Sequence, residues 1–155
     1  MSIQKTFVLV KPDGVQRRLV GEVIQRFERK GLKICALKML RVTKNMAKEH
    51  YKEHIGKEFY EPLIKFITSA PVVAMVVEGA QAIPIVRKMA GKTNFLESEP
   101  GSIRGDFSLC TRYNIVHSAD SVESANREMN IYFKPEEIVN YQITNEIWFI
   151  DEDEN

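Results

Sequence analysis

Two uninterrupted apolar stretches constrain the fold of this chain most strongly. Thr6–Lys11 reads TFVLVK and Val72–Glu78 reads VVAMVVE. A strand with one solvated face alternates apolar and polar residues, so a β-rich run without alternation predicts a strand covered on both faces. We therefore predict two buried strands, the first of them central in its sheet, and expect Gly79 to end the second.

The rest of the chain alternates between helical and extended patterns. After Lys11 we predict a Pro12–Gly14 turn, a helix with Leu19–Phe27 on its apolar face that ends at Gly31, and a strand over Lys33–Val42. A polar helix capped by Thr43, a helix starting in Glu58–Leu63 and the Val72–Glu78 strand follow. The last predicted elements are a helix carrying Ile83–Met89 that ends at Gly91, a strand over Asn114–His117 and a helix from Asp120. Strand, helix, strand, strand, helix, strand is the order of the ferredoxin-like split βαβ arrangement. We predict an α+β fold (βαββαβ) with a four-stranded antiparallel sheet and additional helices, in one domain spanning residues 1–155.

Composition excludes several functions. The net charge is +1 with 28% charged residues, which does not supply the field that non-specific nucleic-acid binding requires. The apolar run before Lys11 is too short for a signal peptide or a membrane span. Cys35 and Cys110 lack paired spacing and lie in apolar surroundings, which indicates buried, reduced thiols in a cytosolic protein.

His117 lies at the junction between a predicted strand and a predicted helix. Asp120 with Glu123 three residues later fits a capping box, and Val122, Ala125, Met129 and Tyr132 recur at the spacing of a helix core face. A histidine there can be a nucleophile, a general base, a metal ligand or a core residue. Its sequence position alone does not decide between these roles.

Polar neighbours favour phosphate chemistry. Arg104 is a fixed cation beside the flexible Gly105, and Asn114 offers a donor and an acceptor. Lys11 stands at the end of a rigid strand before a Pro-Asp-Gly turn. A lysine there is either solvated or aimed at a phosphate, and we favour the second interpretation.

Three other patterns carry weaker hypotheses. His50 and His54 are four residues apart and could share a metal, but the absence of a clear third ligand favours a charged, solvated helix face. The Gly91-Lys92-Thr93 sequence resembles the end of a P-loop, yet the required earlier glycine is replaced by Val86. The irregular Thr93–Ile103 segment is long for a compact domain, which is typical of functional loops.

The sequences NIVHSAD at His117 and KPDGVQR at Lys11 resemble those of nucleoside diphosphate kinases. The family pattern is an asparagine, two residues, the phosphorylated histidine, then a glycine or alanine, a serine and an aspartate. The resemblance extends from about residue 5 to residue 150. It implies the ferredoxin-like fold and a ping-pong reaction in which the γ-phosphate of a nucleoside triphosphate, typically ATP, passes through phosphohistidine 117 to a nucleoside diphosphate.

The resemblance also implies a role for each matching residue. His117, Glu128, Tyr51 and Lys11 would be catalytic; Lys11, Arg87, Thr93 and Arg104 would bind phosphates, Asn114 and Lys11 the sugar, and Phe59 and Leu63 the base. Aromatic stacking does not read base edges, which agrees with broad nucleotide use. Mg²⁺ is implied, held by nucleotide phosphates and water without protein ligands. A cytoplasmic homo-oligomer, a tetramer or hexamer built from dimers, is also implied, with no nucleic-acid or membrane partner.

Two positions depart from the family pattern. Ser118 and Ala119 appear in exchanged order, and the family serine helps to orient the glutamate that corresponds to Glu128. The loss of one such hydrogen bond costs about 1 kcal/mol. Arg112-Tyr113 replaces a common Gly-Arg pair, so Arg112 would be strained if that glycine has a positive φ.

Two rival functions follow from these patterns. A nucleotide-binding regulatory protein could keep the same pocket with little turnover, and the two departures would be its signs. An RNA-recognition module shares the strand order, but it needs an aromatic residue after Lys/Arg-Gly, and Lys30-Gly31 is followed by Leu32.

Overall fold

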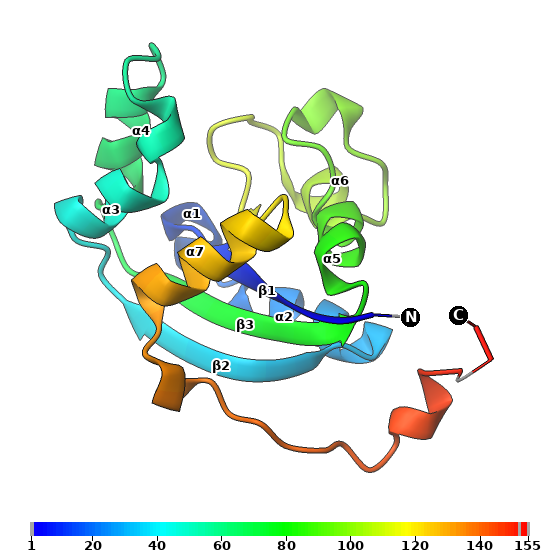
Figure 1. Cartoon of the computed structure of the whole chain (residues 1–155). Coiled ribbons are helices and arrows are strands. Elements are labelled where there is room, and N and C mark those ends of the chain that lie inside the picture. Colours follow the sequence, from blue (N-terminus) through cyan, green and yellow to red (C-terminus); the bar gives the residue numbers. More distant parts are fainter. Residues whose placement is uncertain (1, 152, 155) are drawn as a thin grey trace.

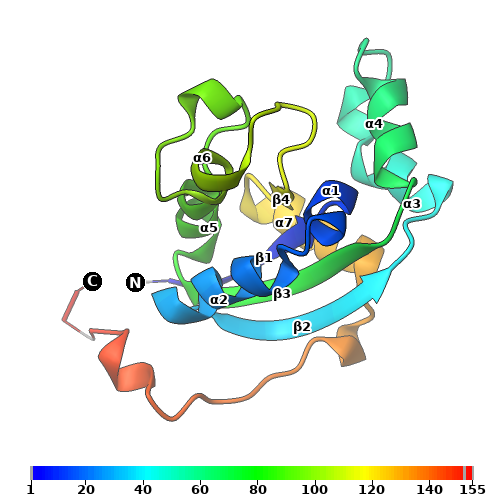
Figure 2. The same cartoon turned by 180° about the vertical axis from the view of Figure 1, so that it is seen from behind.

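The computed structural model describes residues 2–151 and 153–154, and its centre is a four-stranded antiparallel sheet with helices on both faces (Figure 1 and Figure 2). The strand order is β2-β3-β1-β4, which confirms the predicted ferredoxin-like α+β arrangement. The strands are β1 (Ile3–Val10), β2 (Lys33–Leu40), β3 (Val72–Ala80) and β4 (Val116–Ser118). The α-helices are α1 (Pro12–Gln16), α2 (Val20–Lys30), α3 (Lys44–His50), α4 (Tyr60–Ile67), α5 (Ala82–Ala90), α6 (Ile103–Phe107) and α7 (Val122–Tyr132).

The two central strands are buried on both faces, as their unbroken apolar runs predict. Phe7 and Leu9 of β1 belong to the core under α3, α4 and α7, while Val8 and Val10 belong to the core under α2 and α5. All four side chains have an exposed fraction of 0%. Figures 1 and 2 show the helices of these two cores on opposite sides of the sheet. The sheet therefore gives the ends of β1 and β4 a rigid base.

The helix boundaries agree with most of the predicted caps. Gly31 and Gly91 end α2 and α5 with positive φ angles of 98° and 89°. At the start of α3, the Thr43 side chain accepts a hydrogen bond from the backbone N–H of Met46 at 3.2 Å. These caps were readable from the sequence because each depends on local backbone geometry.

Two boundaries near β1 and β3 differ from the prediction. Pro12 does not open a turn but stands at the first position of the short helix α1, where its missing N–H costs nothing. Strand β3 continues past Gly79 to Ala80, because β1 pairs with it along its full length.

The start of α7 also differs from the prediction. The cap is Ser121, whose side chain accepts from the backbone N–H of Ser124 at 3.0 Å, and not Asp120. Val122, predicted for the core face, is the first residue of the helix and is 56% exposed. Asp120 is left on the surface of the cavity described below.

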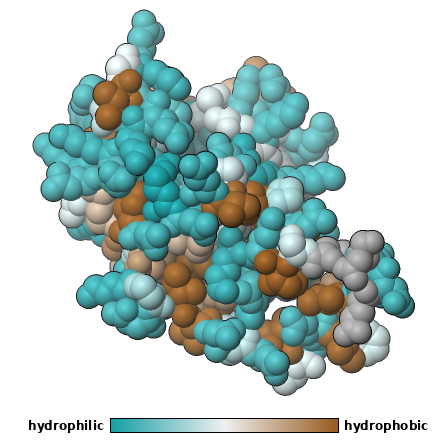
Figure 3. All heavy atoms as spheres, in the orientation of Figure 1, coloured by the Kyte–Doolittle hydropathy of each residue, from teal (hydrophilic) through white to brown (hydrophobic). Residues whose placement is uncertain are grey.

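After α7 the chain runs along the outer edge of β2. The backbone N–H of Val139 donates to the Cys35 carbonyl at 2.8 Å, and the Tyr141 hydroxyl donates to the Ile34 carbonyl at 2.6 Å. Figure 3 shows groups of apolar side chains among hydrophilic ones in this lower part of the molecule. Trp148 in this segment is 79% exposed.

The two cysteines differ in burial, and the acidic tail is exposed. Cys35 is buried and free, whereas Cys110, also free, is only partly buried, contrary to the prediction. The acidic tail Asp151–Glu154 is exposed at its described residues, and Glu152 lies outside them. Within the described part of the chain, no helix has the length and apolarity needed to cross a bilayer.

The cap of α7 gives a direct test of this boundary. Ser121→Ala removes the acceptor for the Ser124 N–H and should lower the free energy of unfolding by about 1 kcal/mol. Ser121→Asp keeps an acceptor and is the matched control. Urea unfolding followed by circular dichroism measures both. A larger loss in Asp120→Ala than in Ser121→Ala would show that Asp120 is the cap after all.

Candidate active site

A cavity of about 690 Å³ opens where the ends of β1 and β4 meet α3, α4, α5 and α7. All ten residues that the sequence singled out line it: Lys11, Tyr51, Phe59, Leu63, Arg87, Thr93, Arg104, Asn114, His117 and Glu128. Lysine and arginine supply five cationic side chains to the lining, and aspartate and glutamate supply three anionic ones. This balance favours an anionic ligand although the whole chain is nearly neutral.

A strained turn places His117. The backbone N–H of Val116 donates to the Asn114 carbonyl at 2.8 Å, which closes a γ-turn around Ile115 with a φ of 75°. A β-branched residue in this region costs about 1–3 kcal/mol. Asp13 accepts from the Ile115 N–H at 2.9 Å, and the Lys11 N–H donates to the Ile115 carbonyl at 2.8 Å.

Gly14 is required for this arrangement. A Cβ atom at Gly14 would lie 2.9 Å from the Ile115 carbonyl oxygen and 2.7 Å from Val10. The KPDG sequence thus serves the histidine directly: its aspartate and lysine hold the strained turn, and its glycine lets the two segments approach.

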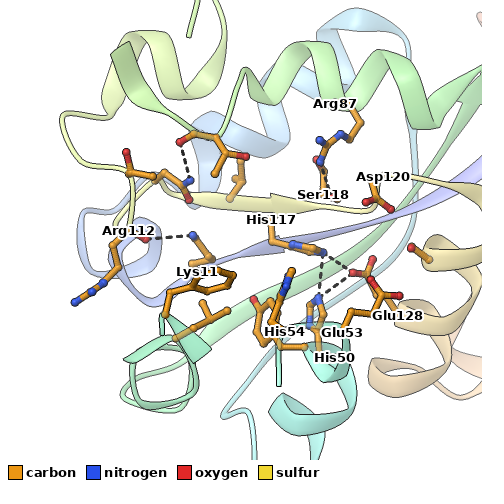
Figure 4. A pocket seen from close by; sticks show the side chains of 18 of the residues that line it. Lys11, His50, Glu53, His54, Arg87, Arg112, His117, Ser118, Asp120 and Glu128 are labelled. Carbon is orange, nitrogen blue, oxygen red and sulfur yellow. Dashed lines mark hydrogen bonds and ion pairs between the residues drawn. The ribbon is translucent and has the colours of Figure 1, made fainter. Parts of the chain in front are cut away.

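His117 is anchored through one ring nitrogen. Its Nε2 lies 2.6 Å from Oε1 of Glu128, a carboxylate on α7 with an exposed fraction of 3% (Figure 4). Burial by itself would raise the pKa of Glu128, but its interactions with His117 and then with His50 lower it to about 2. Ionised Glu128 can only accept, so His117 donates from Nε2. Among the described residues none hydrogen-bonds to Nδ1, whose lone pair is thereby available.

His50 is the site residue that the sequence interpretation missed. We expected it on a solvated helix face, but it is 3% exposed, and its Nε2 lies 2.9 Å from Glu128 Oε1 and 3.0 Å from His117 Nε2. Its Nδ1 lies 2.8 Å from the Tyr132 hydroxyl. One signal could have found it: Ala47, His50 and Tyr51 recur at i, i+3 and i+4, which marks the buried stripe of α3.

The two buried cations of the site, Lys11 and Arg104, differ in how many hydrogen bonds hold them. Burial lowers the pKa of Lys11 to about 8, and its Nζ donates to the Arg112 carbonyl at 3.3 Å. Arg104 is 5% exposed and donates to the carbonyls of Gly91, Asn114 and Val116 at 2.6, 3.3 and 2.6 Å. Burial and then the nearby Arg87 lower the pKa of Arg104 to about 10, so it stays charged at neutral pH.

Arg104 therefore both braces the His117 strand and lines the cavity. A guanidinium has five N–H donors, and three of them are engaged on carbonyls. The remaining donors are available for an anion.

The other predicted ligands lie around these cations. Arg87 is exposed and donates to the Ser118 carbonyl at 3.2 Å, and the buried Asn114 donates weakly to the Thr93 carbonyl at 3.4 Å. Phe59 at the far wall is 48% exposed and meets His54 edge to face at 5.2 Å. An exposed aromatic ring at a cavity mouth is suited to stacking on a planar ligand.

One group of residues in the described part of the chain could chelate a metal ion. His50, His117 and Glu128 place one ligand atom each within 4.8 Å of one another. Two imidazoles and a carboxylate suit zinc-like ions, whereas Mg²⁺ prefers oxygen ligands. The same three atoms are satisfied by hydrogen bonds, so this group is not the expected Mg²⁺ site. The weak hypothesis of a His50–His54 pair receives no support, since His54 is absent from the group.

The two departures from the family pattern have different consequences. Ala119 is 1% exposed, and Oε2 of Glu128 is a buried acceptor with no partner among the described residues. The side chain that would donate there is missing, as expected. Arg112 does not have a positive φ, so the anticipated strain is absent. Its carbonyl holds Lys11, and Tyr113 packs edge to face on Phe66 at 5.0 Å.

The pKa of His50 gives a test by pH. Burial, then the neighbouring His117, lowers it from 6.5 to about 4. Folded His50 stays neutral, while the same residue in the unfolded chain takes up a proton below pH 6.5. The free energy of unfolding must therefore decrease as the pH decreases. Between pH 6.5 and 5 this linkage removes roughly 2 kcal/mol.

Urea unfolding of the wild type and of His50→Gln across this range measures the effect. The variant should lose less stability than the wild type as the pH falls. Parallel stability curves for the two proteins would contradict a neutral, buried His50.

Known proteins resemble this chain closely. The family model described as nucleoside diphosphate kinase matches residues 4–138. A nucleoside diphosphate kinase of Archaeoglobus fulgidus is 55% identical over 150 residues, covering 97% of this chain and 99% of that protein. One of Listeria monocytogenes is 52% identical over 146 residues, covering 94% and 99%.

Solved structures agree with these sequence matches. The nucleoside diphosphate kinase of Halobacterium salinarum, solved in complex with CDP, superposes with a TM-score of 0.94 at 41% identity, covering 97% of this chain and 100% of that one. A cavity that brings an unblocked histidine nitrogen, a buried carboxylate and several cations together fits phosphoryl transfer. The chain belongs to the nucleoside diphosphate kinase family, enzymes that transfer phosphate between nucleoside triphosphates and nucleoside diphosphates.

Proposed function

We propose that the chain performs this transfer in the cavity around His117, with Nδ1 of His117 as the nucleophile. The observation that carries the proposal is the 2.6 Å hydrogen bond between His117 Nε2 and Glu128 Oε1. It fixes the proton on Nε2 and leaves the Nδ1 lone pair for the reaction. The bound carboxylate also keeps the ring from rotating.

The chemistry balances without a net proton transfer. The Nδ1 lone pair forms a bond to the γ-phosphorus of the triphosphate, and the bond from that phosphorus to the bridging oxygen breaks, so the diphosphate leaves with the electron pair. The ring then carries a positive charge, which Glu128 neutralises through the Nε2 proton. An oxygen of the second diphosphate attacks the same phosphorus and returns the electron pair to Nδ1.

Positioned cations would hold the phosphates. In a loose phosphoryl transfer the protein mainly aligns the groups and neutralises charge on the transferred oxygens. Arg87, Arg104, Lys11 and Thr93 are the proposed phosphate ligands, and Tyr51 the proposed catalytic neighbour of His117, its ring 6.2 Å from the imidazole. Asn114 and Lys11 would bind the sugar, and Phe59 with Leu63 the base. Asn114 Oδ1 is a buried acceptor without a described partner, so a sugar hydroxyl could donate to it.

Mg²⁺ is the proposed cofactor. The cavity offers cations and few free carboxylates, so it fits an ion that enters on the nucleotide's phosphates. Asp120 is an exposed carboxylate in the lining and could face such an ion's water shell. The bound ion would neutralise charge on the phosphate oxygens.

The regulatory alternative with little turnover is not favoured. Its suspected signs, Ala119 and Arg112, leave the His117–Glu128 pair in place and add no backbone strain at residue 112.

We also propose a cytoplasmic homo-oligomer, a tetramer or hexamer built from dimers. Strand β2 lies at the edge of the sheet, and its Leu37 and Met39 are 51% and 62% exposed. Exposed apolar side chains on an edge strand are compatible with an association surface there.

Labelling tests the function. Incubation with γ-labelled ATP and Mg²⁺ should give an acid-labile, alkali-stable phosphoprotein, and added GDP should remove the label as GTP. His117→Ala should abolish both steps, since it removes the proposed nucleophile. ATP binding without phosphoprotein or GTP would contradict the kinase function and favour the regulatory alternative.

The unpartnered oxygen of Glu128 gives a second test. Ala119→Ser places a hydroxyl where the family pattern has its serine and should restore a donor to Oε2. The expected gain is about 1 kcal/mol in the transition state, or roughly fivefold in the phosphorylation rate. Ser118→Ala alone is the control and should not give this gain. An unchanged rate in Ala119→Ser would show that Oε2 needs no partner for turnover.

A further inference from the structure

We propose that His50 is a positioning residue for phosphoryl transfer, which fixes the Glu128 carboxylate that in turn orients His117. The inference rests on the proposed function, because it assigns His117 Nδ1 as the nucleophile. It starts from an imbalance at Glu128. Oxygen Oε1 lies within hydrogen-bonding distance of Nε2 atoms from two imidazoles, whereas the buried Oε2 has no hydrogen-bond partner in the described part of the chain.

The proton positions in this network follow from one another. Burial raises the pKa of Tyr132, so its hydroxyl keeps its proton and can donate to Nδ1 of His50 at 2.8 Å. A neutral imidazole whose Nδ1 accepts a hydrogen bond carries its hydrogen on Nε2. His50 Nε2 therefore donates to Glu128 Oε1 at 2.9 Å.

The 3.0 Å separation of the two Nε2 atoms has the same explanation. Both atoms are donors that converge on one oxygen, so their approach is not itself a hydrogen bond. The order of donation is Tyr132 to His50, His50 to Glu128, and His117 to Glu128. One tautomer of each histidine satisfies the whole network.

His50 is well placed to resist movement. Its ring stacks on Tyr51 with centroids 4.3 Å apart and an interplanar angle of 7°, and it meets Phe7 of β1 edge to face at 6.0 Å. Among the described residues, His50 is the only donor to Glu128 other than the reacting histidine. Without it, Glu128 would be tied only to the residue that it has to orient.

The test compares His50→Phe, which keeps a ring but removes the N–H, with His50→Gln, which keeps an N–H donor. Glu49→Gln, next on the same helix and exposed, is the control. The single-turnover rate of His117 phosphorylation should fall about ten- to a hundredfold in His50→Phe. It should fall much less in His50→Gln and stay unchanged in Glu49→Gln.

Two further measurements separate positioning from a purely structural role. A carboxylate that has lost one donor is free to turn away from His117 and then stabilises the protonated ring less, so the acid limb of the pH–rate profile should move to lower pH in His50→Phe and not in His50→Gln. Nitrogen-15 NMR of the labelled histidines should show His117 as the Nε2–H tautomer in the wild type and as a mixture in His50→Phe.

The outcomes distinguish this proposal from the function on which it rests. A His50→Phe protein that is phosphorylated at the wild-type rate, with its pH profile and tautomer unchanged, overturns the positioning role and leaves the kinase function intact. A reduced rate with an unchanged profile and tautomer also overturns it, since the loss is then structural. Failure of the wild type to form any phosphohistidine overturns the proposed function first and the positioning role with it.

Discussion

The structure of the site depends on one buried negative charge. Glu128 is 3% exposed, and burying an ionised carboxylate costs free energy unless hydrogen-bond donors replace the lost water. The compensation comes from two imidazoles that reach the same oxygen from different elements, His117 on β4 and His50 at the end of α3. This single carboxylate therefore joins three parts of the fold and holds the proton on Nε2 of His117, the proposed nucleophile.

The rest of the fold serves that arrangement. Strand β1 is buried between two helical layers from Thr6 to Val10, and Phe7 on one of its faces packs against His50 and stacks on Tyr132. At its end Lys11 and Asp13 hold the strained Ile115 turn that delivers His117. Backbone strain of this kind persists only where surrounding hydrogen bonds over-determine it. Arg104 contributes two of these bonds, to the carbonyls of Asn114 and Val116, while keeping its charge beside the cavity.

The sequence predicted most of the fold because its signals are local. The two apolar runs became the central strands, Gly31 and Gly91 ended their helices, and the ten singled-out residues line one cavity. Their individual roles stay predictions. Boundaries failed where neighbours compete: Ser121 rather than Asp120 caps α7, because both residues are suitable caps and only the backbone decides between them. The contact of His50 with His117, 67 residues away, could not be predicted from the sequence, and the many polar residues of α3 obscured its buried stripe.

The departure at residues 118 and 119 now has a physical meaning. Ala119 leaves one oxygen of Glu128 without a described donor, while His50 secures the other. A hydrogen bond lost at one oxygen need not release the carboxylate when a rigid donor remains at the second. The Ser-Ala order is thus compatible with an active enzyme.

The central claim is that Glu128 holds Nε2 of His117 and thereby leaves Nδ1 to react. The most direct measurement is nitrogen-15 and phosphorus-31 NMR of the ¹⁵N-histidine-labelled protein after phosphorylation by ATP, which identifies the ring nitrogen bonded to phosphorus. We expect a phosphorus–nitrogen coupling to Nδ1 of His117. A phosphate on Nε2, or on a different residue, would contradict it.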